Sequence, residues 1–220
     1  MSLATHIAKC AGVSDRKLGD IESDIKSLNA KSFPVLDDAR GEEMAQRILK
    51  AREEADSVGG VTETVICGTP AGVGEPWFDS VESVISHAVF SLGGVKGIEF
   101  GAGFAAADMK GSECNDPLRV SGGRIVTTTN NNGGINGGIT NGMPIIFRCA
   151  VKPTPSIAQQ QDTVDFIKNE NTQLSIHGRH DPAIIRRICP VLDSVAALCV
   201  ADMLSLRYGT DVLTKGVDDK

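Results

Sequence analysis

Several familiar signatures are missing from this sequence, and each absence narrows the range of possible functions. The six cysteines include no C-x-x-C pair, which argues against a zinc site. No Gly-x-Gly-x-x-Gly follows a strand pattern, so a dinucleotide-binding fold has little support. No apolar run approaches the roughly 20 residues needed to span a bilayer, and no secretory signal is visible at the amino terminus. Positive charge is also scarce, because a net charge of −6 over 220 residues disfavours a nucleic-acid surface.

The composition that remains predicts a cytoplasmic protein with a single domain spanning residues 1–220. Apolar residues make up 41% of the chain and the mean hydropathy is −0.05, a balance typical of globular proteins with a substantial core. All cysteines except Cys114 lie within or beside apolar segments, and we interpret them as buried, reduced thiols. No metal, nucleic-acid partner or membrane partner is therefore expected.

Hydrophobic periodicity predicts a mixture of helices and strands. Strands are expected at residues 1–10, 61–67, 98–100, 124–128 and 143–151, the last apolar enough to be buried on both faces, and an irregular polar excursion at residues 17–38. Helices are expected over Met44, Ile48, Ala51, Ala55 and Val58 with an end at Gly59-Gly60, from Glu75-Pro76 over Phe78, Val81, Ile85, Ala88 and Leu92, and from Asp181-Pro182 with a kink or break at Pro190. The order lacks a βαβαβ rhythm, which predicts an α+β sandwich with antiparallel strands.

Three loops rich in glycine, hydroxyls and cations predict an anionic, phosphorylated ligand. They are residues 133–142 (GGINGGITNG), residues 152–156 (KPTPS) and residues 178–182 (GRHDP). Without a Cβ, glycine lets several backbone N–H groups approach one oxyanion, and Lys152 and Arg179 can neutralise its charge. A glycine-rich hairpin and ordinary turns would explain each loop alone, but the combination of three favours a ligand.

Asp181 has two possible roles. It can cap the following helix, since aspartate is a preferred N-cap and Pro182 suits the first helical position. Beside His180 and Arg179 it can instead accept or relay a proton near a bound ligand. One carboxylate oxygen can serve each role, so the two remain compatible.

At five separated motifs the sequence resembles the chorismate synthases. They are residues 72–76 (GVGEP), residues 91–97 (SLGGVKG), and the three loops at 133–142, 152–156 and 178–182, in the family's order and spacing from about Ile48 to Tyr208. The resemblance implies a β-α-β sandwich, with helices packed between antiparallel sheets, that assembles into homotetramers. It also implies a lyase of the shikimate pathway, which supplies aromatic amino acid biosynthesis. Such a lyase uses reduced FMN to remove phosphate from 5-enolpyruvylshikimate 3-phosphate in a 1,4-anti elimination that yields chorismate.

The resemblance assigns roles to individual positions. Gly93 and Gly94 match a flavin-contacting dipeptide, where many relatives have Asn-Ala, and Gly137 matches the flavin-contacting glycine of the double-glycine loop. Arg179 matches a flavin-site arginine, and Asp181 matches the acid proposed to assist deprotonation through the flavin. The loop that wraps the cofactor is matched by Lys152, Pro153, Thr154, Pro155 and Ser156.

The chain departs from the family in its amino-terminal part. Relatives carry two functional histidines, substrate-binding arginines and an Arg-Ser-Ser flavin motif there, and this sequence has none of these. His6 lies in no such motif and receives no catalytic role. We interpret the sequence as the carboxyl-terminal portion of a chorismate synthase. The alternatives are a non-catalytic module that binds FMN or phosphate, and an inactive fragment that needs a separate amino-terminal half.

Overall fold

A five-stranded antiparallel sheet organises the part of the chain that the computed structural model describes, residues 1–178 and 180–216. Its strands, in spatial order, are β2 (Val13–Ser14), β1 (Ser2–Cys10), β3 (Gly60–Cys67), β9 (Ile145–Val151) and β4 (Val95–Phe100). Every pairing between neighbours is antiparallel. The α+β class with antiparallel strands is therefore confirmed.

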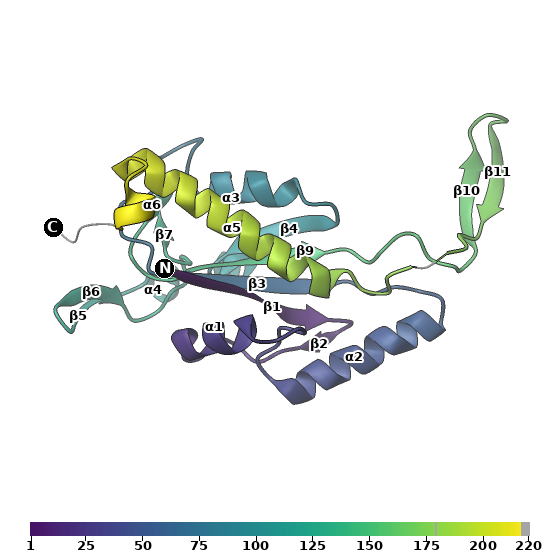
Figure 1. The fold of residues 1–220 in the computed structure, drawn as a ribbon, viewed down its shortest axis with the longest axis horizontal. Coiled ribbons are helices and arrows are strands. Elements are labelled where there is room, and N and C mark those ends of the chain that lie inside the picture. Colours follow the sequence, from purple (N-terminus) through teal and green to yellow (C-terminus); the bar gives the residue numbers. More distant parts are fainter. Residues whose placement is uncertain (179, 217–220) are drawn as a thin grey trace.

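Helices pack on both sides of this sheet (Figure 1). The four long ones are α1 (Ile21–Asn29), α2 (Asp38–Glu53), α3 (Val81–Phe90) and α5 (Ile185–Tyr208). Both α3 and α5 cover one face and bury the main hydrophobic cluster there. On the opposite face α1 packs against Ala4 and Val65. Helix α2 lies at the β1–β2 edge of the sheet, where its Met44 is fully buried.

The alternation of side chains along β9 shows which face of the sheet holds the core. Ile145, Phe147 and Cys149 are buried against α3 and α5, whereas Arg148 is only half-buried and Ala150 is exposed. The prediction that this strand is buried on both faces is wrong, because α1 packs on β1, two strands away from β9. On that open face Arg148 forms an ion pair with Glu99 of β4, with 2.9 Å between Nε and Oε1.

Two helix boundaries differ from the prediction. The helix expected to reach Gly59-Gly60 ends at Glu53, and Ala55 takes the left-handed conformation (φ +56°) that we assigned to glycine. The helix expected from Glu75-Pro76 begins at Val81, after the Ser80 side chain has accepted a hydrogen bond from the Ser83 N–H. Phe78 is not part of its apolar stripe, because that side chain is 85% exposed.

The structure also contains a helix that the sequence did not reveal. The expected irregular excursion at residues 17–38 includes α1, which Asp20 caps at its amino-terminal end. Only Ile25 and Leu28 of this helix bury apolar side chains, so its hydrophobic stripe is too short for a clear periodic pattern. Capping and two core contacts therefore stabilise a segment that looks polar throughout.

Three two-stranded hairpins and three short helical elements complete the described chain. The hairpins join β5 (Leu118–Ser121) to β6 (Arg124–Thr127), β7 (Ile135–Asn136) to β8 (Ile139–Thr140), and β10 (Gln161–Asp165) to β11 (Glu170–Leu174). The short helical elements are the 3-10 helix η1 (Gly103–Asp108), α4 (Gly111–Cys114) and α6 (Val212–Lys215). The β5–β6 and β10–β11 hairpins project from opposite ends of the molecule (Figure 1).

The last long helix, α5, is continuous over 24 residues, so Pro190 does not split it. Pro190 lies in its second turn, where the missing N–H removes one intrahelical bond. An 18-residue window of α5 has a mean hydropathy of 1.7, so length and composition alone would allow it to cross a bilayer. That window was not expected from the sequence, but its buried side chains pack against the sheet and α3 as in a core helix.

Candidate functional site

Two of the three predicted ligand loops lie side by side. The loop at residues 152–156 leaves the end of β9, and residues 180–182 lead into α5. Both are tied to the segment before β3, since the Ser57 hydroxyl donates to the Thr154 carbonyl at 2.6 Å and the Val58 N–H donates to the Pro182 carbonyl at 2.8 Å. Segments about 25 residues apart in sequence therefore meet through residues 57–58.

Asp181 uses its two carboxylate oxygens differently. Oδ1 accepts a hydrogen bond from the Ala183 N–H at 3.2 Å. Oδ2 lies 3.1 Å from Nε of Arg187 in an ion pair, and no donor in the described chain is aligned for a hydrogen bond with it. The prediction that the helix starts at Asp181-Pro182 is wrong, because α5 begins at Ile185 and its N-cap, Ile184, has no side-chain cap.

The turn that contains Gly93 and Gly94 reaches the same region. It follows α3, and the Gly94 carbonyl accepts a hydrogen bond from the Lys152 N–H at 2.9 Å. Gly94 has a φ of +95°, and a Cβ there would lie 2.8 Å from Cδ1 of Ile184. The predicted flavin-contacting turn therefore joins the Lys152 loop at the amino-terminal end of α5.

Two cavities open around Asp181. One of about 270 Å³ is lined by Arg52, Ala55, Asp56, Ser57, Ser156, Ile157, Ala158, Gly178, His180, Asp181 and Pro182. The other, of about 540 Å³, is lined by Leu49, Arg52, His180, Asp181, Pro182 and Arg187. The two cavities share four lining residues, and we refer to them together as the Asp181 hollow. A further cavity of about 550 Å³ shares only Arg187 with this hollow, and one of about 890 Å³ shares no residue with it. No predicted site residue lines either of them.

The sequence prediction missed two cations of this hollow. Arg52 comes from the last turn of α2, which we interpreted only as a packing helix, and no local motif marks it. Arg187 comes from the first turn of α5, where a cation is unfavourable to the helix dipole and is balanced by Asp181. The sequence offered one signal for Arg187: it comes six residues after Asp181, inside the first turn of the following helix, where a cation needs a nearby carboxylate.

The polar groups of this region suit an anionic ligand with several acceptor oxygens. Thr154 Oγ1 is buried without a hydrogen-bond partner in the described chain, and a buried unpaired hydroxyl is costly unless a ligand satisfies it. His180 Nε2 lies 3.1 Å from the Ile176 carbonyl and donates a hydrogen bond to it. Together with Lys152 and Ser156, these groups fit the phosphate and polar ring edges of a flavin mononucleotide.

Gly137 lies apart from these residues. It is the exposed turn of the β7–β8 hairpin, and the neighbouring Gly138 carbonyl accepts from the Val81 N–H at the start of α3. Gly94 follows the opposite end of α3, so the structure does not bring the double-glycine loop into the Asp181 hollow. The predicted flavin-site arginine, Arg179, lies outside the described residues.

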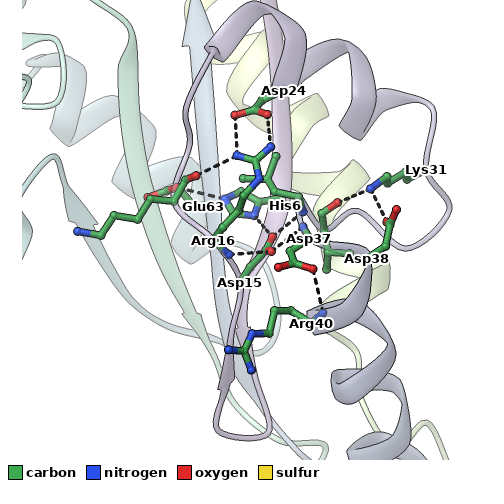
Figure 2. Close-up of polar contacts among 12 residues, drawn as sticks. His6, Asp15, Arg16, Asp24, Lys31, Asp37, Asp38, Arg40 and Glu63 are labelled. Atoms are coloured by element: carbon green, nitrogen blue, oxygen red, sulfur yellow. Dashed lines mark hydrogen bonds and ion pairs between the residues drawn. The ribbon is translucent and has the colours of Figure 1, made fainter.

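A second polar cluster surrounds His6, which is 1% exposed in the sheet (Figure 2). Nδ1 lies 3.0 Å from Asp15 Oδ2, and Nε2 lies 3.1 Å from Glu63 Oε1. Burial lowers the pKa of His6, but the hydrogen bonds to both carboxylates outweigh burial and leave the pKa raised. Burial likewise opposes ionisation of Asp15, yet bonds from His6 and from the Leu36 and Asp37 N–H groups hold its pKa low.

The His6 cluster is a structural one. It joins β1 and β3 to the segment that precedes α2, whose N-cap is Asp37. Because His6 and Asp15 are inaccessible to solvent, they cannot contact a ligand in the Asp181 hollow.

The cysteines are thiols as predicted, but Cys67, expected to be buried, is only half-buried. All six are free, and Cys10, Cys149, Cys189 and Cys199 are buried. Burial raises the pKa of Cys149 to about 12 and that of Cys10 to about 11, so neither is a nucleophile at neutral pH. No group of three metal-ligating side chains occurs within residues 1–178 and 180–216.

Comparison with known proteins gives one consistent result. The family model described as chorismate synthase matches residues 2–205. The chorismate synthase of Methanosarcina acetivorans is 44% identical over 207 residues, covering 94% of this chain and 56% of that protein. That of Chitinophaga pinensis is 52% identical over 160 residues, covering 73% and 48%. A crystal structure of chorismate synthase has a TM-score of 0.76 at 26% identity and covers 95% of this chain and 58% of that one. The chain thus spans about half the length of the curated relatives it matches.

Proposed function

Since this chain belongs to the chorismate synthase family, we propose that it eliminates phosphate from 5-enolpyruvylshikimate 3-phosphate to give chorismate, with reduced FMN as cofactor. The observation that carries the proposal is the meeting of the Lys152 loop, the Gly93-Gly94 turn and Asp181 at the start of α5. Three sequence-distant segments that match the family's flavin site are neighbours here. The cavity beside them is lined by cations as well as by Asp181.

The residues in and beside the hollow have separate tasks in this proposal. Lys152 and Thr154 of the neighbouring loop bind the flavin together with Ser156, which lines the hollow. The rigid backbone at Pro153 and Pro155 holds these three side chains in place. Bound reduced FMN supplies electron density to a substrate that is losing an allylic phosphate. Gly93, Gly94 and Arg179 are further proposed flavin contacts. Gly137 can contact the flavin only if the ligand extends to the far end of β9.

Charge in the hollow suits the elimination itself. Arg187 places its guanidinium group beside Asp181, and Arg52 lines the same cavity. Cations held in a site stabilise the charge that develops on a departing phosphate. Asp181 offers Oδ2 as a carboxylate oxygen without an aligned donor in the described chain, which suits a proton acceptor. Oδ1 meanwhile keeps the carboxylate in place through the Ala183 N–H.

The proposal is tested by two anaerobic measurements on this chain. Titration with reduced FMN should give a saturable change in flavin absorbance, and addition of substrate should then release chorismate and phosphate in equal amounts. Binding without product would identify a non-catalytic flavin module. Absence of both would identify a segment that needs the further sequence of its longer relatives.

We also propose that the protein acts in the cytoplasm as a homo-oligomer, a tetramer as in its family. The six free thiols support a reducing compartment. Large exposed side chains such as Trp77, Phe166 and Leu198 support self-association.

A further inference from the structure

The cavity of about 550 Å³ lies between α5 and the segment that ends α1 and follows it, with β1 at its inner wall. We call it the α1–α5 cavity. Of the residues that line the Asp181 hollow, only Arg187 also lines this cavity. The proposed function assigns no ligand to it.

Four charged side chains line the α1–α5 cavity, and two of them are already paired. Lys31 forms an ion pair with an aspartate of α2, and Arg187 forms one with Asp181. Arg186 and Asp193 remain, and neither forms an ion pair within the described chain. One cation and one carboxylate of this cavity are therefore available to a ligand.

Asp193 lacks a donor for one of its carboxylate oxygens. Oδ1 is buried, and no donor in the part of the chain that the structure describes is aligned for a hydrogen bond with it. Burial raises the pKa of Asp193, and the neighbouring hydroxyl and N–H of Thr5 offset only part of this effect. That hydroxyl is shared with Thr64, at 2.8 Å between the two Oγ1 atoms. A carboxylate in this position gains from a cationic donor.

Arg186 is the matching group of opposite charge. Its Nε donates to the Ser32 carbonyl at 2.7 Å, and this bond fixes the direction of a side chain that is otherwise exposed on α5. A guanidinium carries five N–H donors in a planar fork. The N–H groups of its two terminal nitrogens therefore remain for a carboxylate, which they can bind with two parallel hydrogen bonds.

The spacing of these two residues defines the length of a ligand. Arg186 and Asp193 are seven residues apart, so they share one face of α5 and are offset by about 10 Å along its axis. Cys189 and Pro190, one turn after Arg186, line the cavity between them, and Leu28 of α1 adds apolar lining. The cavity therefore has a cationic end, an apolar middle and an anionic end.

We propose that the α1–α5 cavity binds an ω-amino acid, a zwitterion whose carboxylate and ammonium are joined by a chain of methylene groups. Its carboxylate binds Arg186, its ammonium binds Asp193, and its chain contacts Cys189 and Pro190. An α-amino acid holds its two charges too close together to reach both residues. A simple anion leaves Asp193 without a donor, and a simple amine leaves Arg186 without an acceptor.

The test measures binding to the unmodified chain by isothermal titration calorimetry at neutral pH, without flavin or substrate. The probe is 6-aminohexanoate, which should bind saturably at a one-to-one ratio. Glycine has both charges but no chain, and hexanoate and hexylamine each have the chain but only one charge. Each of these three should bind at least about tenfold more weakly than the probe.

Two variants identify the ends of the ligand. Arg186→Gln should weaken binding of the probe at least about tenfold and leave it no tighter than that of hexylamine to the unmodified chain. Asp193→Asn should weaken it as much and leave it no tighter than that of hexanoate. Loss of one specified charge contact in each variant is a pattern that general damage to the fold does not produce.

Matched controls come from the same helix. Arg207→Gln and Asp202→Asn remove an exposed cation and an exposed carboxylate of α5 outside the cavity, and both should retain full affinity for the probe. Urea denaturation shows whether each variant is folded, and Arg186→Gln, at an exposed position, tests the site independently of Asp193. The proposal is overturned if the unmodified chain does not bind the probe, if hexanoate or hexylamine binds as tightly, or if Arg186→Gln binds the probe normally. None of these outcomes depends on chorismate formation, so this site and the proposed function fail or succeed separately.

Discussion

Asp181 and Arg187 form an ion pair at the start of α5, with 3.1 Å between Oδ2 and Nε. Arg187 is 79% exposed and Asp181 only 23%, so the pair connects solvent to the inner wall of the Asp181 hollow. An ion pair this exposed contributes at most about 1 kcal/mol to stability. The ion pair therefore matters mainly because it orients the Asp181 carboxylate and favours its charged form.

Substitutions of Asp181 should separate its structural role from its chemical one. Asp181→Ala removes the acceptor of the Ala183 N–H and should lower the free energy of unfolding by about 1 kcal/mol. Asp181→Asn keeps an oxygen that can accept this bond, so stability and reduced-FMN binding should remain unchanged. Both variants should slow chorismate formation about 100-fold or more, the usual scale of a lost acid–base group. Urea denaturation and anaerobic turnover measure the two effects, and full turnover in Asp181→Asn would leave the residue with a structural role only.

The start of α5 illustrates how far local signals predict a fold. Asp181 followed by Pro182 is a strong helix-start pattern, yet the helix begins at Ile185. The Pro182 carbonyl is bonded instead to the Val58 N–H, a contact with a segment more than 100 residues earlier. The helix start predicted at Glu75-Pro76 is wrong for the same reason, because Ser80 provides the cap of α3. The existence of α2, α3 and α5 followed from hydrophobic periodicity, whereas α1 did not, and the ends of all these helices depend on tertiary contacts.

The candidate site was predictable only where its residues form local motifs. Lys152 and Asp181 were identified from short strings of sequence, and the structure brings their loops together. Arg52 was not, because a solvated arginine in the last turn of a helix is common. Only the folded chain shows that α2 ends beside Asp181.

Gly59 should be essential for the position of the Lys152 loop. A Cβ at Gly59 would lie 2.5 Å from the Val151 carbonyl oxygen and 2.9 Å from Cδ of Pro153, so Gly59→Ala must displace the end of β9. Overpacking of this kind costs about 1 to 3 kcal/mol. Gly93→Ala is the matched control, since a Cβ there meets nothing within 4 Å, and it should change stability by less than about 0.5 kcal/mol. Equal denaturation midpoints for the two variants would contradict this packing.

Lys152 should contribute to flavin binding through its charge. Its side chain makes no hydrogen bond or ion pair within the described chain. Only the backbone N–H of Lys152 is bonded there, to the Gly94 carbonyl. Loss of a charge-assisted hydrogen bond to a ligand costs about 1.5 to 3 kcal/mol, so Lys152→Ala should weaken reduced-FMN binding at least about tenfold. Lys96→Ala removes an exposed lysine at the start of the neighbouring strand β4 and should not weaken it. Equal dissociation constants for the two variants in anaerobic titration would exclude Lys152 from the flavin site.

The His6 cluster should make stability depend on pH with a defined sign. The folded pKa of His6 is raised above 6.5, so its stabilisation is complete below pH 6.5 and is lost as the pH rises through the folded value. The folded pKa of Asp15 is lowered below 3.8, so its stabilisation is present above pH 3.8 and is lost as the pH falls through the folded value. The free energy of unfolding contributed by the pair should therefore be greatest between about pH 4 and 6.5.

Removal of the imidazole should abolish the alkaline part of this dependence. His6→Gln leaves Asp15 buried without its partner, and breaking a buried pair costs about 3 to 5 kcal/mol. Urea denaturation of this variant at a series of pH values should show a lower plateau and no decline attributable to His6 above pH 6.5. His87→Gln, an exposed position on α3, should retain the profile of the unmodified protein. If His6→Gln kept the same decline, another group would have to titrate in that range, because His6 and its two carboxylates would no longer account for it.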